Sequence, residues 1–145
     1  MLAVCAISCT GHAADDDGND DEPGVFSGHG GCQRDSACAT GELCTRSGAC
    51  LPASEVRAIH VTWTLSGQPA DANTCRVEPR LRINIHASTD RGRVSYAPVP
   101  CVAGKFTVDK LPRSFNQVEL GRERGDAPRS AMIDTAGDAA IDLPF

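Results

Sequence analysis

The sequence predicts a mainly β protein, in which a small disulfide-stapled, cysteine-rich module precedes an antiparallel β-sandwich of about seven strands. Three observations support this prediction. Four cysteines between Cys32 and Cys50 follow one another with five residues in every gap. From Val56 onward, apolar and polar residues alternate in several short stretches, as they do in strands that bury one face. No segment after Pro52 keeps the period of an amphipathic helix.

Composition divides the 145 residues into four parts, namely 1–9, 10–31, 32–52 and 56–145. The second part carries six acidic residues and no Lys or Arg, whereas the acidic and basic residues of the remainder nearly cancel. It also has too few large apolar residues to offset the entropy of ordering. We therefore predict that residues 10–31 form a flexible, acidic tether.

The first nine residues are apolar and end in AISC, where the small residue Ser8 precedes Cys9. This resembles the lipobox of bacterial lipoproteins, which implies that Cys9 receives a diacylglyceryl group and anchors an exported protein to a membrane. A signal peptide needs a basic start and a longer apolar run, so the true start is expected upstream of Met1. Cys5 is the less favoured acceptor because the bulky Val4 precedes it, and an ordinary cleaved signal peptide is the alternative.

The four regularly spaced cysteines are Cys32, Cys38, Cys44 and Cys50. Zinc sites usually hold two ligands at a closer spacing and often include histidine, which is absent from this segment. Because the module has little apolar material for a core, disulfides are favoured and a metal cluster is the alternative. Of the three possible connectivities, a turn at residues 46–48 favours Cys32–Cys44 with Cys38–Cys50, since it places Cys44 opposite Cys50.

The same module resembles short cysteine-rich modules of predicted bacterial outer-surface lipoproteins, particularly of the myxobacterial type. The shared pattern comprises Asp-Ser before the second cysteine, Gly-x-x-Cys at the third, and Gly-x-Cys followed closely by Pro. Residues 35–38, 41–44 and 48–52 carry it here. The resemblance implies a cell-envelope location, expected at the outer membrane and facing the periplasm or the cell surface.

The sandwich is predicted from strict alternation in residues 59–65 and 80–86. Weaker strands are expected at residues 94–96, 105–111, 117–120, 131–134 and 140–143. The core is expected to hold the alternating aliphatic side chains together with Trp63, Tyr96 and Phe106.

Cys75 and Cys101 flank the region of the second strand and are predicted to form a disulfide. If Cys5 is removed with the leader and Cys9 is lipidated, six of the eight cysteines remain, the even number that a disulfide framework requires. Prolines just before Cys101, at positions 98 and 100, predict an edge strand or a bulge, because proline cannot donate to a sheet ladder.

Residues 105–120 contain Leu111-Pro112 between two predicted strands. This segment resembles the strand–Leu-Pro-turn–strand unit of prealbumin-like and Cna-B-like sandwiches, which implies a two-sheet β-sandwich. An immunoglobulin- or fibronectin-like arrangement is the alternative.

Two histidines of the sandwich, His60 and His86, lie on the polar sides of their predicted strands. They would meet if those strands paired, and a metal site is then possible, although exposed strand residues are the favoured interpretation. No nucleophile elbow, phosphate-binding loop, zinc-hydrolase helix or dinucleotide-binding turn appears in the sequence, so no catalytic residue and no cofactor is predicted.

Arginines at positions 80, 82, 91 and 93 would form a basic stripe for a polyanion or an acidic glycan, although a solvated face is the favoured interpretation. Nucleic acid is not an expected partner, because no aromatic residues are interleaved with the basic ones. The prediction is therefore a non-catalytic, exported, lipid-anchored envelope protein with a binding or structural sandwich, whose partner is an envelope protein or a glycan. The alternative is an accessory or glycan-binding module of an exported enzyme system.

Overall fold

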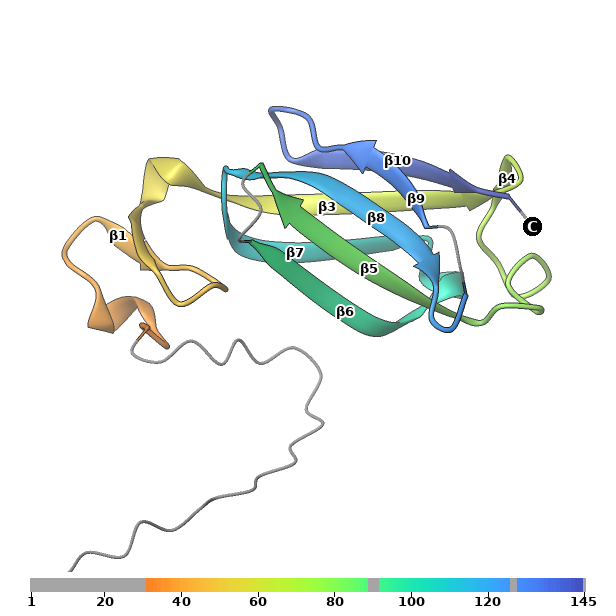
Figure 1. The fold of residues 1–145 in the computed structure, drawn as a ribbon, viewed down its shortest axis with the longest axis horizontal. Helices are drawn as coiled ribbons and strands as arrows, with labels where there is room; N and C mark the ends of the chain where they lie inside the picture. The colour runs from red at the N-terminus through yellow and green to blue at the C-terminus, as the bar shows by residue number, and fades with distance from the viewer. Residues whose placement is uncertain (1–30, 89–91, 126–127, 145) are drawn as a thin grey trace, which may run out of the picture.

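A computed structural model of the chain describes residues 31–88, 92–125 and 128–144. The cysteine-rich module lies at one end of a β-sandwich, and β4 lies at the opposite end (Figure 1). The module consists of a short 3-10 helix, η1 (Asp35–Ala37), and a hairpin of β1 (Glu42–Cys44) and β2 (Cys50–Pro52). A second 3-10 helix, η2 (Ala53–Glu55), connects the module to the sandwich.

The sandwich has seven longer strands and one strand of two residues. They are β3 (Val56–Leu65), β4 (Gln68–Pro69), β5 (Arg80–Ala87), β6 (Arg93–Pro100), β7 (Lys105–Pro112), β8 (Phe115–Arg122), β9 (Arg129–Met132) and β10 (Asp138–Leu143). A 3-10 helix, η3 (Cys101–Ala103), connects β6 to β7. The predicted mainly β fold, with a disulfide-containing module before a sandwich, is confirmed.

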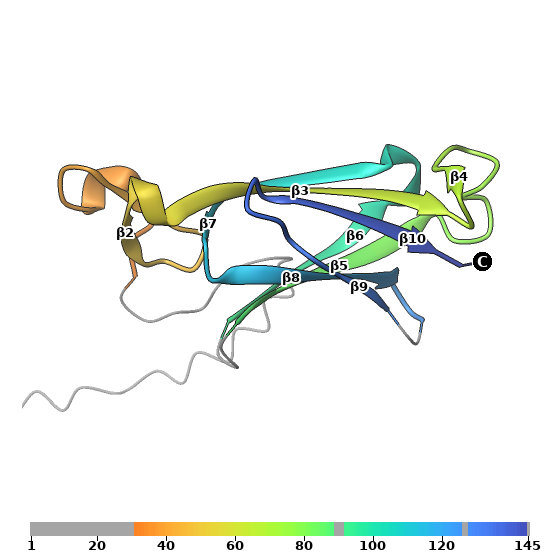
Figure 2. The same cartoon turned by 90° about the horizontal axis from the view of Figure 1, so that it is seen from above.

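Two sheets form the layers of the sandwich (Figure 2). In the first sheet β3 lies between β10 and β7, with β4 paired to its end, and the second sheet has the order β6-β5-β8-β9. An immunoglobulin sandwich pairs its first strand with its second and its third with its sixth, which is not the pairing of the seven longer strands here. The immunoglobulin-like alternative is therefore wrong. One pair, β3 with β10, is parallel, which the antiparallel prediction did not include.

The core lies between the two sheets and follows from the alternation in their strands. Ile59 and Val61 of β3 face Leu81 and Ile83 of β5 across the interior, and none of the four has exposed surface. Burial of a side chain of this size contributes about 1.5–3 kcal/mol. Most of the rest of the cluster comes from β6, β7, β8 and β10, so residues of both sheets share one core.

The three aromatic residues expected in the core differ in burial. Trp63 is buried, whereas Tyr96 and Phe106 are half-buried and pack against the edge of the core. Their ring centroids lie 4.8 Å apart in a tilted arrangement. Because β6 and β7 belong to different sheets, this pair closes one open side of the sandwich. The buried Phe115 at the start of β8 was not expected from the sequence.

The prolines of β6 lie where the sequence places them, on an edge strand with a register irregularity. β6 pairs only with β5, and the register shifts between Leu81 and Ile83. Pro98 follows a cis peptide bond within this irregular stretch. The prediction of an edge strand or a bulge is therefore confirmed. Proline has no N–H group to donate, and such positions in a sheet can lack a donor without breaking the ladder of hydrogen bonds.

Candidate functional site

All three predicted disulfides are present. Cys44 and Cys50 stand opposite each other on β1 and β2, and each is bonded to an earlier cysteine, as Cys32–Cys44 and Cys38–Cys50. The turn between the strands depends on Gly48, whose φ of 77° is unfavourable for other residues. The interleaved connectivity that the sequence favours is thus the one present.

The sulfur atoms of Cys32, Cys38 and Cys44 lie within 4.8 Å of one another. Two adjacent disulfides account for this proximity. A zinc site requires free thiolates, and each of these sulfurs is bonded to another cysteine. The arrangement favours the disulfide interpretation of the module over the metal cluster.

The module docks on the sandwich at a bulge in β7. Ile59 pairs with Val108 and Arg57 pairs with Leu111, so Asp109 and Lys110 together stand opposite a single residue of β3. Lys110 has a φ of 55°, in the left-handed region that glycine favours. A bulge redirects side chains out of the regular alternation, and both bulge residues contact the module.

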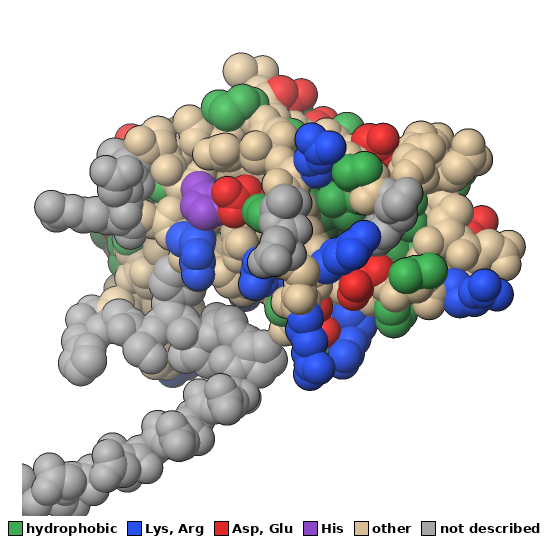
Figure 3. Space-filling model, turned by 45° about the vertical axis from the view of Figure 1, so that its right-hand side comes forward, with side chains coloured by type: hydrophobic (Ala, Val, Ile, Leu, Met, Phe, Trp, Pro, Cys, Tyr) green, Lys and Arg blue, Asp and Glu red, His purple; other side chains and the backbone are tan. Residues whose placement is uncertain are grey.

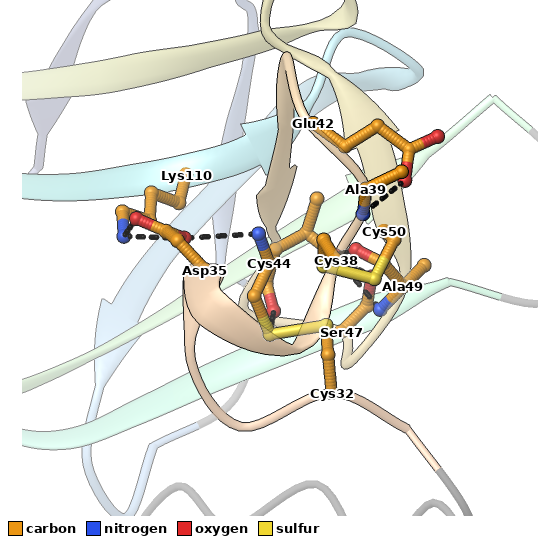
Figure 4. Close-up of a disulfide and its surroundings, with 11 residues drawn as sticks. Cys32, Asp35, Cys38, Ala39, Glu42, Cys44, Ser47, Ala49, Cys50 and Lys110 are labelled. Carbon is orange, nitrogen blue, oxygen red and sulfur yellow. Dashed lines mark hydrogen bonds and ion pairs between the residues drawn. A yellow bond between two sulfur atoms is a disulfide. The ribbon is translucent and has the colours of Figure 1, made fainter.

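Two ion pairs and one backbone hydrogen bond make this junction. The Lys110 ammonium lies 2.7 Å from Asp35 Oδ2, and Arg46 Nε lies 3.0 Å from Asp109 Oδ1. The Arg46 amide donates to the Lys110 carbonyl at 3.0 Å. Asp35 also accepts from the Cys44 amide, so its carboxylate lies between the sandwich and the disulfide (Figure 4). The module is thus fixed to β7 by complementary charges.

A groove with a volume of about 450 Å³ runs along this junction. Its walls come from the module and from the bulge, and they include Arg34, Thr45 and Gly48 besides the ion pairs. Both carboxylates in its walls, Asp35 and Asp109, are engaged by the cations that face them. The groove therefore marks the boundary between the module and β7.

Asp35 and Asp109 make the docking dependent on pH. The hydrogen bond from Lys110, followed by that from the Cys44 amide, holds the pKa of Asp35 below its ordinary value, and the hydrogen bond from Arg46 does the same for the pKa of Asp109. Such a carboxyl stabilises the folded form above the unfolded-state pKa of about 3.9. Its contribution is lost as the pH falls through the lower folded-state pKa.

We expect the protection factor of the Arg46 amide against hydrogen exchange to fall in acid, below about pH 4. Asp35→Asn should make the fall smaller, and the double variant with Asp109→Asn should abolish it. Glu55→Gln, which removes an exposed carboxylate that makes no contact with the junction, is the control and should behave as the wild type. A wild-type protection factor independent of pH would show that the ion pairs do not hold the module.

The two histidines do not meet, because the strands that carry them do not pair. His60 lies on β3 and His86 on β5, which belong to different sheets. His60 Nδ1 is 3.0 Å from Thr107 Oγ1, and His86 Nε2 is 3.0 Å from Glu119 Oε2. Strand parity was correctly predicted for both, but which strands pair depends on the tertiary fold.

The predicted basic stripe is only partly continuous. Arg80 Nε is 3.0 Å from Glu123 Oε2, and Arg91 lies outside the described residues. Arg82 is half-buried and Arg93 is exposed on the outer face of the sheet.

Sequence reasoning missed Asp35, Arg46, Asp109 and Lys110 as a connected set. One signal was available in the sequence of β7. The apolar residues Phe106 and Val108 are separated by one polar residue, but two polar residues, Asp109 and Lys110, stand between Val108 and Leu111. Such an interruption is typical of a bulge.

The lipidation site Cys9 and the tether lie outside the described residues. Among the residues that are described, no helix has the length and hydropathy needed to cross a membrane. Comparison with protein-family models, with curated proteins and with solved structures finds no match.

Proposed function

We propose that this chain is a non-catalytic, exported protein of the cell envelope, anchored to a membrane by a lipid on Cys9. One observation carries the proposal: the six cysteines that follow the leader pair completely, as three disulfides. Disulfides of this density persist in oxidising compartments and compensate for small cores. The lipobox-like sequence at Ser8-Cys9 supplies the means of attachment.

The arrangement of the parts supports a binding or structural role for the sandwich. The described chain begins at the module, at one end of the molecule (Figure 1). A tether ending there would leave both sheet faces of the sandwich accessible to an envelope partner. The docked module, which is stapled by Cys32–Cys44 and Cys38–Cys50, would act as a rigid base between tether and sandwich.

Fatty-acid labelling tests the anchor. With a basic and apolar signal segment fused before Met1, labelled palmitate should be incorporated into the wild type and into Cys5→Ala, but not into Cys9→Ala, because the small Ser8 precedes only Cys9. Equal labelling of the wild type and Cys9→Ala would exclude Cys9 as the lipid acceptor. An unlabelled protein in the culture medium would instead indicate an ordinary cleaved signal peptide.

A further inference from the structure

The outer face of the second sheet carries a regular array of polar side chains. Leu81 and Ile83 of β5 are fully buried, so the residues that alternate with them lie on the outer face. We call these outward-facing residues of β5, β6 and β8 the polar face. They form two rows of cross-strand neighbours, Arg93–His86–Gln117 and Ser95–Asn84–Glu119, and Arg82 is added to them.

Four members of the polar face contact one another in pairs. Ser95 Oγ donates to Asn84 Oδ1 at 2.7 Å, and Asn84 is almost completely buried although it points away from the core. Glu119, the one carboxylate of the polar face, is 3.0 Å from His86 Nε2. The hydrogen bond between Ser95 and Asn84 and the close approach of His86 and Glu119 therefore restrict the positions of these four side chains.

Among the described residues, the two arginines of the polar face have no such partner. Within the described part of the chain, neither Arg82 nor Arg93 forms an ion pair, whereas Arg80, just outside the polar face, pairs with Glu123. Arg82 is half-buried, and a partly desolvated guanidinium without a carboxylate favours an external anion. Basic side chains are spread over the side of the molecule seen in Figure 3, some beside acidic side chains.

The positions of these arginines restrict the size of the anion. Arg93 lies beside His86, and Arg82 lies four residues before His86 on β5. Four residues of a strand span about 13 Å. Two cations anchored this far apart on the sheet suit an extended ligand with repeated negative charges.

We propose that the polar face binds an acidic polysaccharide, with uronate carboxylates on Arg82 and Arg93 and sugar hydroxyls on the amide and hydroxyl groups between them. This inference names the partner class of the proposed envelope protein and rests on its export. A glycan suits the polar face better than a nucleic acid does, because its seven residues include no Phe, Tyr or Trp on which bases could stack, and its one imidazole, His86, lies against Glu119.

Binding of polygalacturonate to the full, disulfide-bonded chain tests the proposal. The wild type should bind it saturably, neutral dextran should not bind, and free galacturonate should not compete at the same sugar concentration. The double variant Arg82→Gln/Arg93→Gln should bind at least about tenfold more weakly, since two charge-assisted contacts are lost. Its affinity should also depend less on salt than that of the wild type.

Arg76→Gln is the matched control, because Arg76 is an exposed arginine of the loop before β5 and is not part of the polar face. It should bind within about twofold of the wild type. Unchanged melting temperatures would show that all variants are folded. Equal binding by the wild type and the double variant, an equal loss in Arg76→Gln, or no saturable binding at all would overturn the proposal. These assays need no lipid, so they fail or succeed independently of the palmitate labelling.

Discussion

Replacement of Trp63 by alanine is expected to lower the free energy of unfolding by about 3–5 kcal/mol, the usual cost of deleting a core aromatic. Trp63 is 4% exposed and belongs to the cluster between the sheets. Its indole Nε1 also donates to the Cys101 carbonyl at 2.9 Å, which ties β3 to the connection between β6 and β7. A loss of this size is comparable to the whole stability of a small domain, and denaturant melts measure it.

Two further variants separate the causes. Trp63→Phe keeps an aromatic ring but removes one of the two donors to the Cys101 carbonyl, which still accepts from the Gly104 amide. The lost hydrogen bond should cost about 0.5–1.5 kcal/mol, apart from the loss of ring volume. His60→Ala changes the outward-facing side of the same strand and should cost no more than about 0.5 kcal/mol. If His60→Ala were as damaging as Trp63→Ala, the burial assigned to β3 would be wrong.

Removal of the Cys75–Cys101 disulfide is expected to have the second-largest effect. The two cysteines are 26 positions apart, and the chain-entropy model gives about 3 kcal/mol for closing a loop of that length. Both cysteines are also buried, so Cys75→Ala/Cys101→Ala loses packing as well. Trp63 donates a hydrogen bond to the Cys101 carbonyl, so the two sites are coupled. The losses of unfolding free energy of this double variant and of Trp63→Ala should therefore not add up when the changes are combined, as denaturant melts would measure.

The Cys38–Cys50 disulfide provides the comparison. It lies in the module, which contacts the sandwich mainly through exposed ion pairs, and such pairs contribute about 0–1 kcal/mol. Cys38→Ala/Cys50→Ala should therefore change unfolding of the sandwich by less than about 1 kcal/mol. A loss equal to that of the Cys75–Cys101 variant would mean that module and sandwich unfold as one unit.

Local patterns in the sequence were sufficient to predict the strands and most of the core. The alternation of Ile59, Val61, Trp63 and Leu65 corresponds to the buried positions of β3, because side chains of a strand point to opposite faces by geometry alone. The module disulfides were predictable for a similar reason. A hairpin turn fixes which cysteines stand opposite each other, and both members of each pair lie within 12 residues.

The pairing of distant strands was not predictable, because it depends on the packing of the whole chain. β3 pairs with β10 across more than seventy residues, and no local pattern specifies that contact or its parallel direction. The same limit explains why the sequence left open whether His60 and His86 meet. Asn84 could not be recognised as buried either, since its burial on the outer face depends on neighbours contributed by β6 and β8.

Disulfide mapping of the full chain, purified without reductant from an oxidising compartment, tests the central claim most directly. We predict no free thiol among the six cysteines from Cys32 to Cys101, and peptides linked as Cys32–Cys44, Cys38–Cys50 and Cys75–Cys101. Two or more free thiols among these six, or zinc released stoichiometrically from the module on denaturation, would contradict a disulfide-stapled exported protein.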